Sequence, residues 1–261
     1  MSRPVPAATA ALRVLRFLSM QAAPVPAARV ASAIELPRSS AYHLLAAMEQ
    51  EGFVTHYPDD RLWGIGLAAY EVGVGYSRQA PLARLARLPT AQLVDATGQS
   101  AHLALLHGRE VVYVLEERAP GKPPLVTDVG VRLPAALTAS GRAILATLPA
   151  PQIRALFPDR GAFVDRHGRG PGTPTALRQL LSDTRTRGYA TEDGEVTPGF
   201  ASVAVAIDSP PGAATFASVA VTYDSERDSP ATDDLVASIS AAAESIAARL
   251  RGASPGVRGA R

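Results

Sequence analysis

The chain lacks cysteine altogether, and its 261 residues include a single lysine, Lys122, and a single tryptophan, Trp63. Without cysteine, neither disulfide bonds nor cysteine-ligated metal sites can form. No apolar run approaches the ~18 to 20 residues that span a membrane, and residues 1–6 lack the charged-then-apolar pattern of a secretory signal peptide. We therefore expect a soluble cytoplasmic protein with no membrane partner and no cofactor.

The charge of the chain is nearly balanced, with a formal net charge of +2 that comes almost entirely from arginine on the basic side. Its length suffices for two modest domains, each with its own core. Composition alone therefore sets limits on the architecture but does not indicate a function.

The most informative segment is residues 36–52, which has the pattern of an amphipathic helix. Ala41, Leu44, Leu45 and Met48 follow the i, i+3, i+4, i+7 spacing of a core-facing stripe. The opposite side carries small polar and aromatic groups near the amino end, as a DNA recognition helix does. We predict that these DNA-contacting residues are Arg38, Ser39, Ser40, Tyr42 and His43.

The flanking segments favour a winged helix-turn-helix over residues 8–66. Helical patterns at 8–20 and 26–34 precede it, and Pro26 is available at the first helical position. Three residues, Glu35 to Pro37, separate the second and third helices, since proline disfavours helical geometry in its predecessor. Strand-like runs at 53–57 and 61–65 follow, joined by a turn-forming Pro-Asp-Asp. An ordinary all-α domain is the alternative.

Residues 1–66 are almost neutral overall, whereas a nucleic-acid binder usually has a basic face. Three arginines are nevertheless well placed: Arg29 on the second helix, Arg38 at the start of the third, and Arg61 in the wing. One such domain should bind DNA weakly and in a salt-sensitive way. We therefore expect paired domains on a two-fold-symmetric operator.

Residues 67–97 are interpreted as a linker. A short helix is predicted at 67–76, weakened by Gly73 and Gly75, and a second at 81–96, interrupted at Pro89. Beyond Gly98 the period changes to that of strands, with a hairpin at 101–106 and 111–116. This change of period places the boundary of the second domain at residue 98.

The second domain, residues 98–251, mixes strands and helices. Thr173 and Gly188 bound one helix, and a long helix capped by Thr232 places Leu235, Ile239, Ile246 and Leu250 on one face. An antiparallel sheet with grouped helices predicts an α+β fold. The remaining expected elements are strands at 124–132, 200–207 and 216–223, helices at 138–147 and 151–157, a turn at 208–212, an exposed loop at 159–172, and a disordered tail at 252–261.

Three stretches in order resemble the IclR family of bacterial transcriptional regulators, over residues 8–251. They are Leu-Pro-Arg-Ser-Ser-Ala-Tyr-His-Leu-Leu from residue 36, Leu-Pro-Ala-Ala-Leu-Thr-Ala-Ser-Gly-Arg-Ala from residue 133, and Gly-Tyr-Ala-Thr-Glu-Asp-Gly-Glu-Val-Thr-Pro-Gly from residue 188. The resemblance implies a GAF-like carboxy-terminal domain that binds a small effector and helps to form dimers or tetramers. His43, where members often have arginine, should alter base preference, and Ala136 replaces a common histidine.

A possible effector site begins at Thr138-Ala-Ser-Gly-Arg142, where the start of a helix could receive a carboxylate on its backbone N–H groups. The resemblance implies that Ala139 and Ser140 occupy these anion-binding positions. It also implies pocket positions at Glu192, Ser202, Ala220 and Thr222, with Leu125 and Leu133 as apolar walls. The alternative is that Ser140 merely caps a helix and that Ser202 and Thr222 are ordinary strand residues.

Motifs for catalysis are missing from the second domain. There is no Gly-x-Ser-x-Gly elbow, the Gly-Arg-Gly-Pro-Gly at 168–172 lacks the Lys-Ser/Thr end of a phosphate-binding loop, and His102 and His107 lack a third ligand nearby. We therefore predict a homo-oligomeric, effector-responsive transcription factor, with repression favoured over activation. A stand-alone effector sensor and an enzyme are the alternatives.

Overall fold

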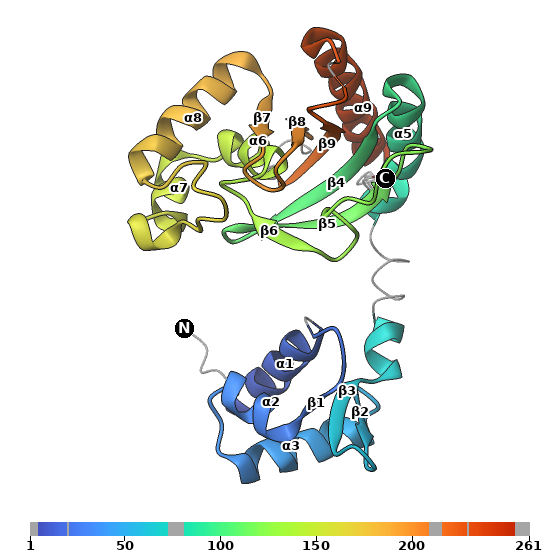
Figure 1. Ribbon diagram of the computed structural model, residues 1–261, viewed down its shortest axis with the longest axis vertical. Helices are drawn as coiled ribbons and strands as arrows, with labels where there is room; N and C mark the ends of the chain where they lie inside the picture. Colours follow the sequence, from blue (N-terminus) through green and yellow to red (C-terminus); the bar gives the residue numbers. More distant parts are fainter. Residues whose placement is uncertain (1–4, 20, 73–80, 209–215, 229, 254–261) are drawn as a thin grey trace, which may run out of the picture. The chain divides into compact units, whose positions relative to one another are not determined.

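A computed structural model describes residues 5–19, 21–72, 81–208, 216–228 and 230–253 of the chain. The chain divides into two compact units, Met1–Ala80 and Pro81–Arg261 (Figure 1). None of the described helices is long and apolar enough to cross a membrane.

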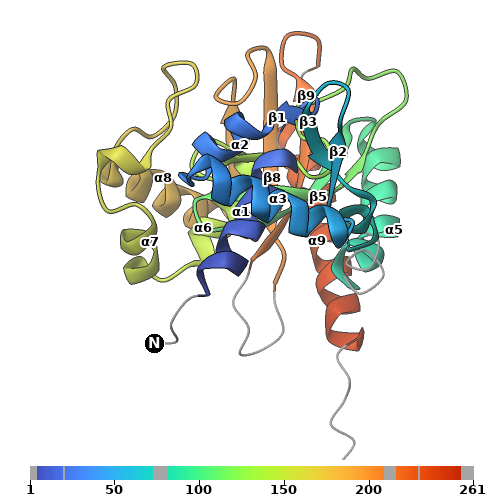
Figure 2. The same ribbon diagram turned by 90° about the horizontal axis from the view of Figure 1, so that it is seen from below.

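The first unit packs three helices against a small antiparallel sheet of order β1-β3-β2, visible in Figure 2. Trp63 of β3 lies in its core with Val14, Val30 and Leu45. This confirms the predicted three helices and wing, but β1 was not expected, and Pro26 precedes the second helix as its N-cap rather than lying at its first position. The elements are α1 (Pro6–Ser19), β1 (Val25–Pro26), α2 (Ala27–Ala33), α3 (Arg38–Gln50), β2 (Val54–Tyr57) and β3 (Leu62–Ile65).

Leu12 of α1 is not part of this core. Its side chain is 66% exposed, whereas Val14 and Leu18 are buried. A helix follows the wing at residues 67–72. The rest of the helix predicted over 67–76, including Gly73 and Gly75, lies outside the described residues.

The second unit is built on an antiparallel sheet of order β6-β5-β4-β9-β8-β7. The predicted hairpin is present as β4 and β5, and the later pair of strands as β8 and β9. Edge strand β7 was not predicted, because its four residues are too few for a clear period. The strands are β4 (Ser100–His107), β5 (Glu110–Glu117), β6 (Arg132–Pro134), β7 (Ala190–Asp193), β8 (Phe200–Ala206) and β9 (Ala217–Asp224).

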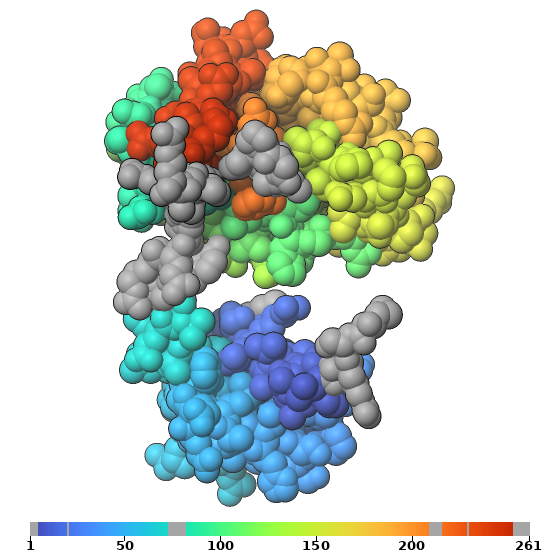
Figure 3. Space-filling model, turned by 180° about the vertical axis from the view of Figure 1, so that it is seen from behind, coloured from blue at the N-terminus to red at the C-terminus, as the bar shows by residue number. Residues whose placement is uncertain are grey.

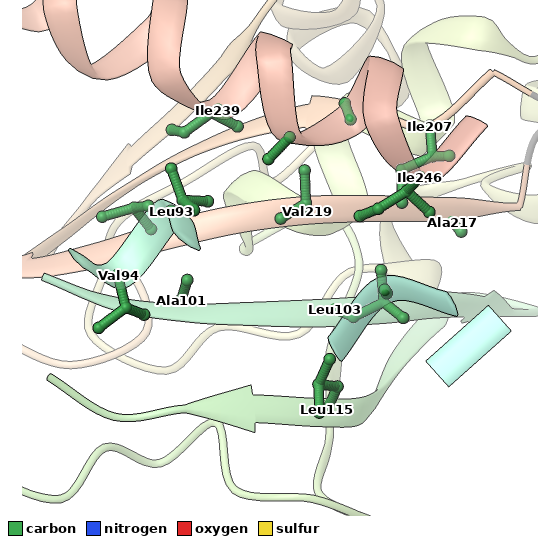
Figure 4. Packing of buried hydrophobic residues seen from close by; sticks show 14 of the residues in the cluster. Leu93, Val94, Ala101, Leu103, Leu115, Ile207, Ala217, Val219, Ile239 and Ile246 are labelled. Carbon is green, nitrogen blue, oxygen red and sulfur yellow. The ribbon is translucent and has the colours of Figure 1, made fainter. Parts of the chain in front are cut away.

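Helices cover both faces of this sheet. Val203 and Val221 belong to a core cluster with α5 (Pro81–Thr97) and α9 (Thr232–Ala253), whereas Ala204 and Ala220 contact α6 (Ala139–Thr147). Since successive strand residues point to opposite faces, α5 and α9 lie on one face and α6 on the other. Figure 3 shows α9 beside α5, and Figure 4 shows their side chains meeting those of β4, β5 and β9.

Helix α5 corrects the predicted linker. It belongs to the second unit, because its apolar side chains, among them Leu82 and Leu93, are buried in the core that it shares with α9. Pro89 lies inside one continuous helix and does not interrupt it. A proline removes one helical hydrogen bond, and burial of the surrounding apolar face offsets that loss.

Other boundaries need smaller corrections. Residues 124–131 form no strand, and β6 begins only at Arg132. Thr232 is already helical, and α9 continues to Ala253, into the predicted tail. Residues 254–261 and most of the predicted 208–212 turn lie outside the described residues. The remaining helices are α7 (Ala150–Leu156), the short 3-10 helix η1 (Arg160–Ala162) within the predicted loop, and α8 (Pro174–Arg187).

Helix α8 has the predicted ends. The Thr173 hydroxyl accepts a hydrogen bond from the Ala176 amide, and Gly188 ends the helix in the left-handed region at φ 82°. Glycine adopts that conformation without the steric cost that a Cβ imposes. Here local sequence alone determined both termini.

Candidate functional site

Helix α3 of the first unit has the two faces predicted for it. Ala41, Leu45 and Met48 are buried, while Tyr42 remains 52% exposed. The other polar residues predicted to contact DNA, Arg38, Ser39, Ser40 and His43, are exposed as well. The helix thus presents a solvated polar face supported from behind by the core.

The turn before α3 sets where that face begins. Glu35 adopts a left-handed φ of 57°, and the Leu36 amide donates to the Ala31 carbonyl, closing α2. Pro37 then precedes α3 in an extended conformation. Arg29 and Arg61 are exposed on α2 and in the wing turn, where Arg61 follows two acidic residues and has a φ of 55°.

A partly enclosed cavity of about 60 Å³ lies in the second unit between the sheet, the start of α6 and two loops. Seven of the eight predicted effector residues line it: Leu125, Ala139, Ser140, Glu192, Ser202, Ala220 and Thr222. The exception is Leu133. It pairs with Val111 across β5 and β6 and is buried in a separate hydrophobic core cluster. The other lining residues are His102, Tyr113, Pro124, Val126, Thr127, Thr138, Val196, Thr197 and Phe200.

Larger hollows exist, including one of about 430 Å³ between α6, α8 and α9. It is lined by alanines and several polar residues, whereas the smaller cavity gathers buried polar side chains that are joined by hydrogen bonds. Ligand sites combine apolar walls with a few convergent polar groups, so we regard the smaller cavity as the candidate site. Among the described residues, no cluster of acidic or histidine side chains could hold a metal ion.

Five neighbouring strands each place one polar side chain on the cavity side of the sheet, which we call the polar row: Tyr113, His102, Thr222, Ser202 and Glu192. The Ser202 hydroxyl donates to Glu192 Oε1 at 2.8 Å and contacts Thr222 Oγ1 at 2.8 Å. His102 Nε2 lies 2.8 Å from Thr222 Oγ1, and Thr127 Oγ1 lies 3.4 Å from His102 Nδ1. A continuous chain of hydrogen bonds therefore runs across the sheet.

Glu192 closes one end of this chain and is almost fully buried, at 5% exposure. Burial raises the pKa of Glu192 to about 7; the Ser202 hydrogen bond opposes the shift, and the neighbouring Glu195 carboxylate adds to it. Within the described part of the chain no donor reaches Glu192 Oε2. The negative charge of the neighbouring Glu195 carboxylate further favours the protonated form of Glu192.

His102 and Tyr113 extend the polar row beyond the residues that sequence reasoning identified. Burial lowers the pKa of His102 to about 3, so the imidazole is neutral. Burial also raises the pKa of Tyr113, whose ring meets His102 edge-on at 5.7 Å. The sequence contains a signal for His102. Successive strand residues point to opposite faces of a sheet, so a histidine between the core residues Ala101 and Leu103 points to the other face.

The start of α6 forms the other end of the cavity. The Thr138 hydroxyl accepts from the Gly141 amide, and the amides of Ala139 and Ser140, at the first helical positions, have no acceptor in the preceding turn. A Cβ at Gly141 would lie 2.2 Å from the Ala135 carbonyl oxygen, so only glycine allows this close approach. These amides and the helix dipole suit an anionic group.

Arg142 anchors the loop that follows β7. Its guanidinium is buried and donates to the carbonyls of Ala136 and Thr191 at 2.9 and 2.7 Å, and to Glu195 Oε1 at 2.9 Å. The Asp193 amide also donates to Glu195. Two cavity residues, Val196 and Thr197, lie in this loop, so the Arg142–Glu195 ion pair helps to shape the cavity wall.

Each of the two units is similar to a known family of domains. The IclR helix-turn-helix domain matches residues 7–58, and the C-terminal domain of the bacterial transcriptional regulator IclR matches residues 74–248. The Glycerol operon regulatory protein of Streptomyces coelicolor is 30% identical over 207 residues, 79% of this chain and 80% of that protein. The Transcriptional repressor IclR of Escherichia coli is 26% identical over 201 residues, 76% and 73% of the two chains.

A solved structure shares the fold. It is an IclR homologue of Microbacterium hydrocarbonoxydans complexed with 4-hydroxybenzoate, with a TM-score of 0.76 at 22% identity, covering 94% of this chain and 99% of that one. These matches cover nearly the whole chain, in the order of motifs that the sequence presented, and the matching proteins are regulators rather than enzymes. The chain therefore belongs to the IclR family of bacterial transcriptional regulators.

Proposed function

We propose that the protein is a cytoplasmic transcriptional repressor that binds a palindromic operator as a homo-oligomer, and that a small organic acid bound in the cavity changes its affinity for DNA. The observation that carries this proposal is the cavity itself, because buried polar groups converge there on a helix start suited to an anion. The DNA-binding face of α3 belongs to the other unit. A separate binding site is what effector control requires.

On the DNA side, the exposed face of α3 is proposed to enter the major groove. Arg38 would contact phosphate, while Tyr42 and His43, with Ser39 and Ser40, would approach base edges. Arg29 and Arg61 would contact the backbone on either side. Because acidic residues adjoin Arg61, a single unit has a weak electrostatic attraction for DNA, and this favours binding by paired units.

On the effector side, Ala139 and Ser140 would receive the acid group, with Leu125 and Ala220 as apolar walls and Glu192, Ser202 and Thr222 as polar partners. The 4-hydroxybenzoate in the Microbacterium homologue supports an organic acid as the ligand class. Such a ligand regulates by binding one arrangement of the oligomer more tightly than another, which shifts the population between them. Relatives named as repressors favour repression.

A gel-shift titration of the full-length protein on the DNA beside its own gene tests the proposal. We expect a sequence-preferring shift that weakens steeply with salt, and a change in apparent affinity when an acid found by thermal-shift screening is added. Absence of any sequence-preferring shift would overturn the regulator proposal. Acid binding without such a shift would instead indicate a stand-alone sensor.

A further inference from the structure

Two loops border the cavity. Residues 194–199, after β7, form one of them, which we call the anchored loop, and residues 118–131, between β5 and β6, form the other, which we call the proline loop. Each contributes side chains to the cavity lining: Val196 and Thr197 from the anchored loop, and Pro124, Leu125, Val126 and Thr127 from the proline loop. How firmly each loop is held determines where a ligand can enter.

Side chains from outside the anchored loop hold it at several points. Arg142 Nη2 donates to Glu195 Oε1 at 2.9 Å. Arg169 Nη1 donates at 3.2 Å to the main-chain carbonyl of the residue just before the loop, and His167 Nε2 lies 3.3 Å from the Val196 carbonyl oxygen. Loss of one of these contacts leaves the others in place.

The proline loop is held at its two ends. The Ala119 amide donates to the buried Ser100 hydroxyl at 3.2 Å, and the Gly130 amide donates to the Tyr113 carbonyl at 2.8 Å. Gly121 and Gly130 have left-handed φ values of 76° and 88°, a region that glycine enters without steric cost. Glycines at both ends can absorb the change of φ that a hinge requires, so the segment between them can turn while the ends stay on the sheet.

Main-chain hydrogen bonds do not hold the middle of the proline loop. Pro123 and Pro124 carry no amide hydrogen, and in the part of the chain that the structure describes no main-chain hydrogen bond joins residues 123–127 to the sheet. The Thr127 hydroxyl lies 3.4 Å from His102 Nδ1, which is long for a hydrogen bond. A stronger side-chain contact is needed to keep this segment against the cavity.

An ion pair supplies that contact. Lys122, the only lysine of the chain, follows the first glycine of the loop, and its Nζ donates to Asp228 Oδ2 at 2.7 Å. The Asp228 amide donates to the carbonyl of Asp224, the last residue of β9, at 2.8 Å, so the acid is fixed to the sheet. The hydrogen bond from Lys122 lowers the pKa of Asp228, which keeps the pair ionised at neutral pH. Both side chains are partly buried, at 28% and 23% exposure.

The size of the cavity requires one wall to move. Its volume is about 60 Å³, whereas a cavity of about 150 Å³ holds benzene. A ligand of that size therefore fits inside only after a loop moves outward. Among the described contacts, displacing the anchored loop breaks those to two arginines and a histidine. Displacing the middle of the proline loop breaks one ion pair and one long hydrogen bond.

We propose that the proline loop is the gate of the cavity and that the Lys122–Asp228 ion pair is the latch that keeps it closed. This inference rests on the proposed function for the presence of a ligand in the cavity. Opening the gate separates Lys122 from its acid, so the strength of the ion pair sets the fraction of molecules whose cavity is accessible. A ligand that needs the open form binds in proportion to that fraction.

The lack of cysteine in the chain makes a direct test possible. Ser140→Cys places a single thiol at a cavity-lining position that is 2% exposed. Its labelling by N-phenylmaleimide, a neutral reagent whose ring exceeds the closed cavity, is measured on the full-length protein without DNA or added acid. At low reagent concentration the labelling rate follows the open population. Adding Lys122→Met should raise this rate about five-fold, the upper end for a solvent-accessible ion pair.

The partner of the lysine should behave in the same way. Asp228→Asn should raise the labelling rate as much as Lys122→Met, and the double variant should raise it no further, because all three lack the same interaction. Arg132→Met breaks an ion pair between β5 and β6 at 3.3 Å and is the matched control, which should leave the rate unchanged. No acceleration in Lys122→Met, or equal acceleration in Arg132→Met, would overturn the inference.

A second reporter separates opening of the gate from unfolding. Ser218 is fully buried but does not line the cavity, so Ser218→Cys should be labelled only on unfolding, at a rate that rises steeply with dilute urea. The rate for Ser140→Cys should barely respond to urea, because a local opening exposes little surface. The same steep response at both positions would show that only unfolding exposes the cavity. If Ser140→Cys does not fold, Ala220→Cys on β9 provides another thiol at the cavity.

A variant of the other loop tests which loop moves. Arg169→Met removes a contact of the anchored loop and should leave the labelling of Ser140→Cys unchanged; acceleration as large as in Lys122→Met would make the anchored loop the gate. Labelling needs neither DNA nor an effector, so the two proposals fail separately. Absence of a gel shift leaves the latch in place, whereas a labelling rate that ignores Lys122 leaves the regulatory function in place.

Discussion

The two units of this protein differ in how far the polar side chains of their candidate sites are exposed to solvent. In the first unit, the polar face of α3 is exposed to solvent. In the second, the polar row is buried beside a small cavity, and burial holds both His102 and Glu192 in their neutral forms near pH 6. Exposed groups thus keep their hydration, whereas burial sets the protonation states of His102 and Glu192.

The largest effect is expected where a buried charge loses its partners. Arg142→Met should destabilise the second unit by about 3 to 5 kcal/mol, since Glu195 and two carbonyls lose their donor. Trp63, the only tryptophan, lies in the first unit, so denaturant unfolding followed by its fluorescence should change little, while the circular dichroism transition moves to lower denaturant.

Arg178→Met is the matched control, because Arg178 is exposed on α8, and it should shift neither transition appreciably. If Arg142→Met moved the Trp63 transition as far as the circular dichroism transition, the two units would not unfold separately. The two units would then differ in the exposure of their polar side chains but not in their unfolding.

The next effect comes from opposing pH dependences inside the polar row. The stability that Glu192 contributes is full below pH 4.5 and is lost as the pH rises toward about 7, because folding raises its pKa. His102 contributes stability above pH 6.5 that is lost as the pH falls toward about 3, because folding lowers its pKa. Between pH 4.5 and 6.5 the two groups change the unfolding free energy with pH in opposite directions, so their contributions cancel in the wild-type protein.

Single substitutions should expose each slope. Between pH 4.5 and 6.5, Glu192→Gln should become more stable with rising pH and His102→Gln less stable, each by about 1.4 kcal/mol per pH unit. Unfolding free energies from urea titrations at several pH values measure this. His107→Gln, on the exposed histidine at the end of the same strand, should keep the flat wild-type profile; parallel profiles in all variants would contradict the assignment.

On the exposed side, Arg38→Ala should weaken DNA binding on all sequences alike. Loss of one phosphate contact should reduce the slope of log affinity against log salt by about 1. Gel shifts over a salt series measure the slope, with Arg13→Ala on α1 as the control. A change confined to one base pair of the operator would instead assign Arg38 to base readout.

The smallest effect is expected at His43, whose loss should change preference rather than overall affinity. His43→Ala should alter discrimination at one base position by about 1 kcal/mol, at the lower end for a base contact. Competition gel shifts with operators mutated at single positions can locate that position. Equal weakening on every operator would show that His43 touches the backbone.

Local patterns predicted much of the fold and part of the cavity. The stripe on α3, the ends of α8 and the four principal strands follow from periodicity and capping, which act over a few residues. Seven effector positions came from family resemblance and do line the cavity. Leu133 does not, because the pairing of β6 with β5 directs it into a separate core cluster.

Errors arose where distant contacts override local preference. Pro89 lies within a helix because α9 and the sheet hold α5 in place. The partners of His102, Thr127 and Thr222, lie 25 and 120 residues away in the sequence, so no local pattern indicates them.

The sequence by itself determined the family, the helix that we propose faces DNA and the glycine that lets α6 approach the preceding loop. These depend on the size and spacing of neighbouring residues. Only the tertiary structure decided the character of the cavity. Strand order brings His102, Thr222, Ser202 and Glu192 into one row, and exclusion of water from that row shifts the pKa values of His102 and Glu192 toward their neutral forms.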